Sequence, residues 1–177
     1  MQRSFLWALL VPSLLLCASN RSLFEESSPT MDVNTCMERT EIQNSQTPVD
    51  LFKSSAICIE EKKYAQAADL YLVATAYGYF DTARVIDKSM NQVLDALKTE
   101  HFGPIDASKR NKFAEVLRAR LDNMKSSCAF LTKLGKPTYY PKYMVEESVV
   151  TRGDGLILNY DAKAFWDDTL SNYLRCP

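Results

Sequence analysis

The sequence predicts a mainly helical protein with a small β-hairpin near its C-terminus, held together by disulfide bonds. Over most of the range 48–134, apolar residues recur at steps of three and four, the period of an amphipathic helix. Between residues 148 and 160, two β-prone runs flank a glycine-containing turn. Four cysteines follow a hydrophobic leader, an arrangement typical of a disulfide framework. These patterns predict one helical domain over residues 48–177, with a bundle of about five helices.

The composition excludes several classes of protein and of functional site. Hydrophobic residues make up 46% of the 177 residues and charged residues 24%, which are globular values. Lys and Arg number 21 against 22 Asp and Glu, so there is no basic excess that would indicate nucleic-acid binding. His101 is the single histidine, which excludes a multi-histidine metal centre. We expect neither a cofactor nor a metal ion.

Residues 1–19 have the pattern of a secretory signal peptide. Arg3 supplies a positive charge, and an uncharged apolar run over 5–18 follows it. This run is shorter than the ~20 residues of a membrane-spanning helix, so we expect no transmembrane helix here. Small residues at 17–19 fit a signal-peptidase site, which predicts cleavage near Ser19 and a periplasmic or secreted protein.

Cys17 leaves a second interpretation of the leader open. The run Leu14-Leu15-Leu16-Cys17 is similar to the cleavage box of bacterial lipoproteins, although Leu16 stands where that box has a small residue. Under this interpretation Cys17 carries a lipid that anchors the protein to the outer membrane. Both interpretations leave four cysteines in the mature chain.

The mature chain is expected to begin with a flexible arm over residues 20–47, which is rich in Ser, Thr, Asn and Glu. Its four cysteines permit three pairings. Cys58 and Cys128 both fall within helical patterns, so we favour Cys58–Cys128, which leaves Cys36–Cys176 to tie the arm to the C-terminus. Buried free thiols are the alternative.

Helices are expected to start at Thr47-Pro48, an N-cap followed by proline at the first helical position. Gly78 is the expected C-cap of the second helix. The clearest helix carries one apolar stripe, formed by Phe113, Leu117, Leu121, Met124, Cys128 and Leu131. The predicted helices cover 48–60, 64–77, 80–98, 108–134 and 162–174, and the hairpin pairs 148–151 with 156–160.

One stretch combines a helical period with small residues at fixed places: Lys63-Tyr64-Ala65-Gln66-Ala67-Ala68, then Leu70-Tyr71, Ala74, Gly78 and Ala83. This stretch, from Cys58 to Arg84, resembles about one unit of the Sel1-like and tetratricopeptide helical repeats. The resemblance implies an antiparallel helix hairpin, and in these families stacked hairpins present a concave surface to peptides or proteins. Exported bacterial members include immunity proteins that block secreted toxins, so the resemblance favours a binding role. It assigns no functional residue.

The near-zero net charge conceals one basic segment. Residues 109–136 carry eight Lys and Arg against two Asp and Glu, whereas residues 20–108 carry eight against fourteen. On a helical wheel, four basic side chains fall opposite the apolar stripe: Arg118, Lys125, Lys133 and Lys136. We expect this face to dock an acidic protein partner or an anionic membrane surface. An ordinary solvated helix face is the alternative.

Aromatic residues crowd the C-terminal third of the chain and either line a groove or form a core. Tyr139 and Tyr140 are adjacent between two prolines and cannot both point inward, so we expect them to be exposed interface residues.

The sequence lacks a phosphate-cradling glycine loop, a Gly-x-Ser-x-Gly elbow and a His-Glu-x-x-His motif. We therefore expect an exported, non-catalytic protein-binding protein, in its most specific form an immunity or inhibitor protein that covers the active site of a secreted toxin or hydrolase. Two alternatives stay open: an envelope hydrolase that uses His101 with a carboxylate, and a structural adaptor of an envelope complex.

Overall fold

The computed structural model describes residues 33–150 and 152–176. The predictions of a signal peptide over residues 1–19 and of a lipid on Cys17 lie outside the described residues. The described helices are α1 (Pro48–Glu60), α2 (Tyr64–Arg84), α3 (Asn91–Phe102), α4 (Ala107–Asp122), α5 (Lys125–Leu134), α6 (Lys142–Val145) and α7 (Ala162–Asp168). Short helical turns add η1 (Arg39–Glu41), η2 (Lys88–Met90) and the π-helical η3 (Thr169–Tyr173), which continues α7. The predicted mainly helical class is confirmed.

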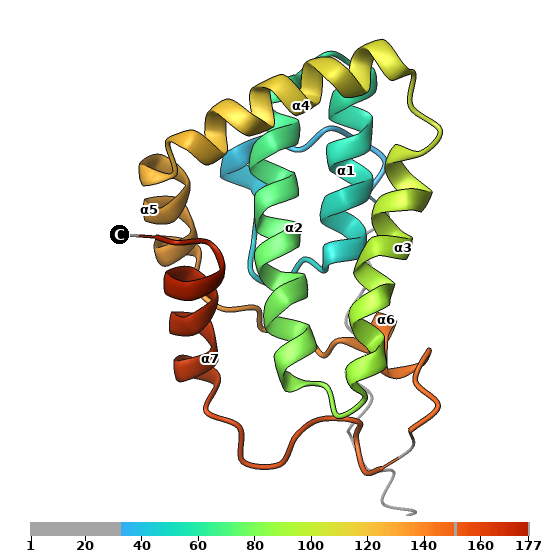
Figure 1. Ribbon diagram of the computed structural model, residues 1–177, viewed down its shortest axis with the longest axis vertical. Coiled ribbons are helices and arrows are strands. Elements are labelled where there is room, and N and C mark those ends of the chain that lie inside the picture. The colour runs from blue at the N-terminus through green and yellow to red at the C-terminus, as the bar shows by residue number, and fades with distance from the viewer. Residues whose placement is uncertain (1–32, 151, 177) are drawn as a thin grey trace, which may run out of the picture.

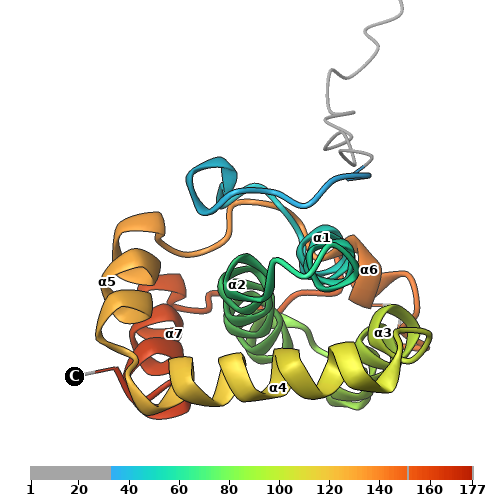
Figure 2. The same cartoon turned by 90° about the horizontal axis from the view of Figure 1, so that it is seen from above.

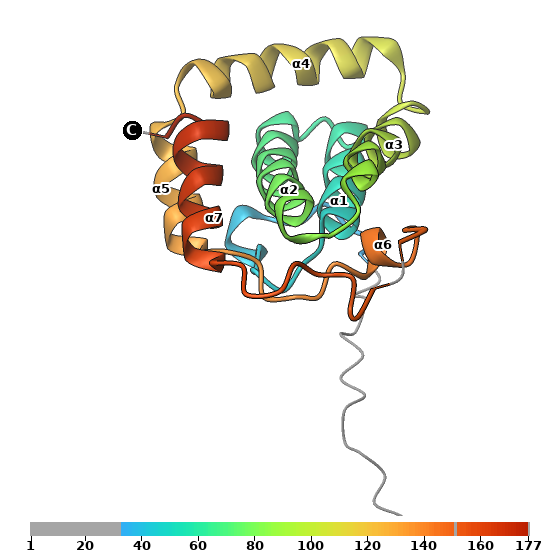
Figure 3. The same ribbon diagram turned by 60° about the horizontal axis from the view of Figure 1, so that its bottom comes forward.

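The fold is arranged around α2, as Figures 1 and 2 show. Helices α1, α2 and α3 lie side by side, and α4 runs across one end of α1 and α2 (Figure 3). Helices α5 and α7 with η3 lie on the side of α2 away from α3. The main hydrophobic core therefore includes residues from nearly every helix, and the α2 residues Leu70, Ala74 and Tyr77 are fully buried in it.

Helices α1 and α2 pack against each other, and α1 covers the residues that the sequence predicts. Thr47 caps α1 by accepting a hydrogen bond from the Asp50 backbone N–H, and Pro48 follows it at the first helical position. The Ser55 hydroxyl donates to the Ala67 carbonyl over 2.8 Å, and the Ala67 side chain is fully buried. Small residues at this contact let the two helices approach closely.

Helix α2 does not end at Gly78, so the prediction of a C-cap there is wrong. The helix continues to Arg84, and Gly78 lies in a tight contact with α3. A Cβ atom at Gly78 would overlap the Leu94 side chain, which explains why a residue without a side chain stands here.

The predicted β-hairpin over 148–160 is wrong, since no strand occurs among the described residues. The segment instead pairs with the end of α2 through an isolated bridge between Val85 and Leu156. The Ile157 N–H donates to the Arg84 carbonyl over 2.8 Å, and the Ile86 N–H to the Gly155 carbonyl over 3.0 Å. These bonds use backbone groups that a continuous 80–98 helix would need, so that predicted helix is broken as well.

The predicted helix over 108–134 is also divided. Asn123, with φ −134° and ψ 77°, leaves the helical conformation, so the chain turns between α4 and α5. This turn places Cys128 and Leu131 of α5 in the core beside α2.

The four cysteines among the described residues form disulfides, but both predicted pairings, Cys58–Cys128 and Cys36–Cys176, are wrong. The bonds are Cys36–Cys58 and Cys128–Cys176. Because α4 carries the chain away across the ends of α1 and α2 (Figure 3), α5 lies beside the C-terminal residues, and Cys128 bonds to Cys176 there.

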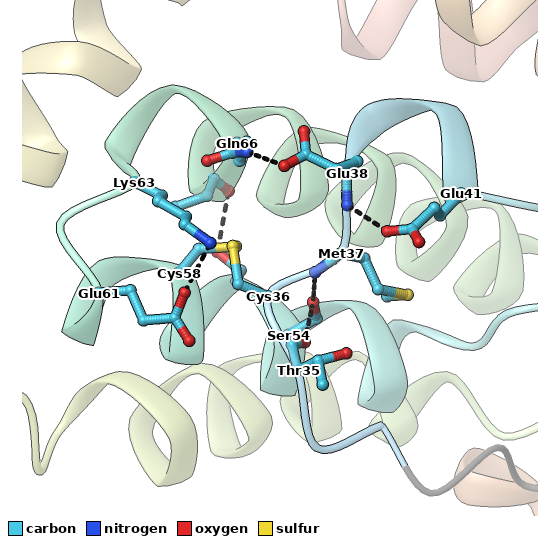
Figure 4. Close-up of a disulfide and its surroundings, with 12 residues drawn as sticks. Thr35, Cys36, Met37, Glu38, Glu41, Ser54, Cys58, Glu61, Lys63 and Gln66 are labelled. Atoms are coloured by element: carbon cyan, nitrogen blue, oxygen red, sulfur yellow. Dashed lines mark hydrogen bonds and ion pairs between the residues drawn. A yellow bond between two sulfur atoms is a disulfide. The ribbon is translucent and has the colours of Figure 1, made fainter.

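The predicted flexible arm over 20–47 is corrected from Val33 onward, where the chain packs on α1 and α2 (Figures 2 and 4). Met37 is buried, and its N–H donates to the Ser54 hydroxyl over 2.9 Å. The Ser54 hydroxyl in turn donates to the Thr35 carbonyl over 2.8 Å, which holds Cys36 beside Cys58 one turn further along α1.

Candidate functional site

The four predicted basic residues of the α4–α5 region are exposed. Arg118 lies on α4, Lys125 begins α5, and Lys133 and Lys136 lie at its far end. None of them forms an ion pair within the part of the chain that the structure describes. Neighbouring cations of α4 are paired, as Arg120 is with Asp69 over 3.3 Å. These four positive charges are therefore available to a partner.

A pocket of about 640 Å³ opens beside Lys125, between α2, the α4–α5 turn and the C-terminal residues. We call it the corner pocket. Most of its lining is apolar or aromatic, with polar groups near the turn. The lining residues are Tyr71, Leu72, Thr75, Leu117, Leu121, Asp122, Asn123, Met124, Lys125, Tyr173, Leu174 and Arg175.

Helical spacing builds two walls of the corner pocket. Tyr71 and Thr75 are one turn apart on α2, and Leu117 and Leu121 are one turn apart on α4. Leu121 remains 50% exposed, so it presents apolar surface at the mouth. The Thr75 hydroxyl oxygen is buried and has no hydrogen-bond partner among the described residues.

The third wall is the C-terminal turn, which three interactions hold in place. The Cys128–Cys176 disulfide joins it to α5, and the Cys176 N–H donates to the Leu170 carbonyl over 2.8 Å. The Tyr173 ring stacks on Tyr79 with centroids 3.9 Å apart, while its side chain stays 42% exposed. Burial raises the pKa of the Tyr173 phenol, which therefore stays neutral at physiological pH.

A second groove of about 610 Å³ lies where η1 packs on α5, and Lys133 is part of its lining. Arg39 also lines it, but this guanidinium is already engaged. It lies 4.4 Å from the centre of the Phe130 ring and donates to the Ser126 carbonyl over 2.8 Å. The groove therefore offers fewer free groups than the corner pocket does.

Tyr139 is 4% exposed, so the prediction that it is an exposed interface residue is wrong. Its hydroxyl donates to Asp81 Oδ2 over 2.7 Å, and the Tyr143 hydroxyl donates to the same oxygen over 2.8 Å. Arg84 pairs with the other oxygen of Asp81. Tyr140, at 44% exposure, is exposed as predicted, and its hydroxyl donates to the Asp154 carbonyl.

This buried network is a feature that sequence reasoning missed. Asp81 and Arg84 stand three residues apart on α2, a spacing that permits an ion pair, but the pattern does not show that both are buried. Because the network is closed off from solvent and internally satisfied, it serves to hold the 139–143 segment against α2.

His101 lies in the last turn of α3 and not in a loop. Its Nε2 atom is buried and has no hydrogen-bond partner among the described residues. Burial lowers the pKa of this imidazole. His101 lines neither the corner pocket nor the groove beside η1, so these cavities and the one histidine lie apart.

Comparison of the chain with protein-family models, curated proteins and solved structures gives no match. Within residues 33–150 and 152–176, no helix has the length and apolar character needed to cross a bilayer. The same residues contain no cluster of three or more His, Cys, Asp or Glu side chains placed to hold a metal ion.

Proposed function

We propose that the protein is an exported binding protein of the inhibitor or immunity type, which docks an acidic protein partner on the α4–α5 face. The observation that carries this proposal is the corner pocket, a largely apolar cavity whose lining includes the exposed and unpaired Lys125. Exposed apolar side chains with unpaired charges around them are typical of protein-binding surfaces.

Electrostatics support a partner of negative charge. A cation that has no internal ion pair loses no existing contact when it meets a partner's carboxylate, and it attracts that carboxylate before contact. Complementary charges chiefly raise the association rate, and salt screens the effect. We therefore expect fast, salt-sensitive association.

The two disulfides support export, because such bonds persist in oxidising compartments and are rare in reducing ones. A periplasmic or secreted location would bring the protein to toxins and hydrolases that act there. The inhibitor role accounts for a compact body with an accessible pocket and unpaired charges.

The partner is first identified by crosslinking the mature chain, residues 20–177, in envelope extracts and is then purified. Association of the purified pair is measured for wild-type protein and for the Arg118→Glu/Lys125→Glu variant at low salt. We expect this variant to associate at least about tenfold more slowly. The matched control is Lys62→Glu/Arg152→Glu, two exposed cations outside this face whose reversal changes the net charge equally.

Equal slowing in both variants, or in neither, would contradict docking on the α4–α5 face. The inhibitor role itself is measured by the activity of the purified partner and by survival of cells that co-express the two proteins. An adaptor would bind without changing either readout.

A further inference from the structure

We infer that the corner pocket receives one bulky apolar side chain, of the leucine or phenylalanine class, from an acidic segment of the partner. This inference rests on the proposed function and names the chemistry that its site recognises. It is carried by the pocket's shape, by the charges at its rim and by the fixation of its walls.

The lining of the pocket suits a large apolar side chain, and its volume leaves room for part of the segment that carries this side chain. Its volume is about 640 Å³, and its walls are formed mainly by aromatic and aliphatic groups. Leu121 and Tyr173 stand half-exposed at the mouth, so an inserted side chain would remove their apolar surface from water. A small or polar side chain would leave this apolar surface in contact with water and would contribute little binding free energy.

The rim specifies the residues that flank the inserted side chain. Lys125 and Arg175 line the pocket, and neither has an ion-pair partner in the described part of the chain. Asp122 is the carboxylate of the lining, so the net charge around the mouth is positive. A segment with Asp or Glu beside its apolar residue complements this rim, and one with Lys or Arg is repelled.

The pocket is already shaped before anything binds. The Cys128–Cys176 bond fixes the C-terminal wall to α5, and the Tyr79–Tyr173 stack fixes it to α2. Because the cavity is already formed, little conformational entropy is lost in ordering its walls when a partner binds. Short peptides are therefore sufficient probes of its preference.

The test is an NMR titration of the ¹⁵N-labelled mature protein with three capped heptapeptides. The first has leucine at its centre and glutamate on both sides, the second replaces leucine by alanine, and the third replaces the glutamates by lysine. We expect the leucine peptide to bind at least about tenfold more tightly than either variant, since the buried side chain and the flanking charges both contribute. The largest shift changes should fall on Thr75, Leu121 and Tyr173.

Two variants localise the binding. Leu121→Asp should abolish it, whereas Leu158→Asp should not, because Leu158 is 84% exposed in the loop before α7 and lies outside the pocket. Leu121→Gln, which adds no charge, should weaken binding at least threefold. This variant tests the same contact if Leu121→Asp does not fold. The spectra of all three variants must retain the dispersion of the folded protein.

Equal affinity for the leucine and alanine peptides, no saturable binding, or equal effects of Leu121→Asp and Leu158→Asp would each overturn the inference. If the purified partner still associates in a manner that depends on Arg118 and Lys125, the proposed function stands while this inference fails. If that dependence is also absent, both fail.

Discussion

At the scale of single residues, the buried Asp81 carboxylate interacts with three other side chains. It accepts from the hydroxyls of Tyr139 and Tyr143 and pairs with Arg84, whose guanidinium also donates to the Tyr139 carbonyl over 2.9 Å. The Asp81 side chain is fully buried and that of Arg84 nearly so. Each buried charge depends on the other, because neither can reach water.

Replacing Asp81 by asparagine should therefore be strongly destabilising. Asp81→Asn keeps the shape but leaves the Arg84 charge buried and uncompensated, and we expect the free energy of unfolding to fall by about 3–5 kcal/mol in urea titrations. Asp95→Asn is the control, since it breaks the exposed pair with Lys98, which contributes at most about 1 kcal/mol. A loss of similar size in the two variants would show that the Asp81 network is not a buried ion pair in solution.

His101 should make stability depend on pH. Burial holds its folded-state pKa below the value of about 6.5 in the unfolded chain, so the unfolded chain takes up this proton first as the pH falls. Stability is therefore complete above the unfolded pKa and declines as the pH falls below about 7, until the folded-state pKa is passed. We expect urea titrations at pH 7.5 and 5.5 to show this decline and the His101→Gln variant to reduce it. A decline of the same size in the variant would assign it to other groups.

At the scale of elements, the contact between α2 and α3 depends on one missing side chain. Leu94 occupies the space that a Cβ atom of Gly78 would need. Glycine within a helix lowers helix stability by about 1 kcal/mol relative to alanine, so the packing must compensate for it.

Gly78→Val should reduce the free energy of unfolding by about 1–3 kcal/mol, because the Leu94 side chain or α3 itself has to move. Adding Leu94→Ala in the same chain should recover part of that loss, which a double-mutant cycle measures as a coupling energy. Ala65→Val, at an exposed position of α2, controls for the poorer helix propensity of valine and should cost less than about 1 kcal/mol. Strict additivity would mean that the two side chains do not meet.

The elements that sequence reasoning predicted well are those fixed by local chemistry. The start of α1 follows from the Thr47 cap and Pro48, and the exposed face of α4 and α5 follows from the helical period. The break after Arg84 was missed because its cause lies about 70 positions away, where Gly155 and Ile157 exchange backbone hydrogen bonds with α2 and the residues after it. The hairpin prediction failed for the same reason, since those backbone groups bond to another segment.

The candidate site shows the same division. A helical wheel was sufficient to predict that the side chains of Arg118 and Lys125 are exposed to solvent. The corner pocket could not be predicted in this way, because it combines α2, α4 and the C-terminal turn, which only the tertiary fold brings together. The prediction for Tyr139 was wrong because a proline-rich sequence pattern does not show that a buried carboxylate, here that of Asp81, accepts a hydrogen bond from this tyrosine. Pairing of the cysteines likewise depends on the path of α4.

At the scale of the whole molecule, the two disulfides fix the two ends of the described chain in different ways. Cys36–Cys58 holds the arm on α1, and Cys128–Cys176 holds the C-terminal turn on α5. Each bond limits the freedom of the unfolded chain and is worth about 2–4 kcal/mol.

Removing the second bond should affect stability and the pocket together. We expect Cys128→Ser/Cys176→Ser to lower the free energy of unfolding by about 2–4 kcal/mol and to raise hydrogen exchange across residues 169–176. Cys36→Ser/Cys58→Ser is the matched control, with a loss of the same order but unchanged exchange in that turn. Protected amides at 169–176 in the first variant would show that the wall of the corner pocket needs no covalent tether.

The order of these bonds along the chain has a consequence for maturation. The first cysteine of the described chain joins the second and the third joins the fourth, so the two loops follow one another and neither encloses the other. A chain threaded N-terminus first into an oxidising compartment presents Cys36 and Cys58 before Cys128 emerges. An oxidase that joined thiols in their order of arrival would therefore make both native bonds directly, without reshuffling by an isomerase.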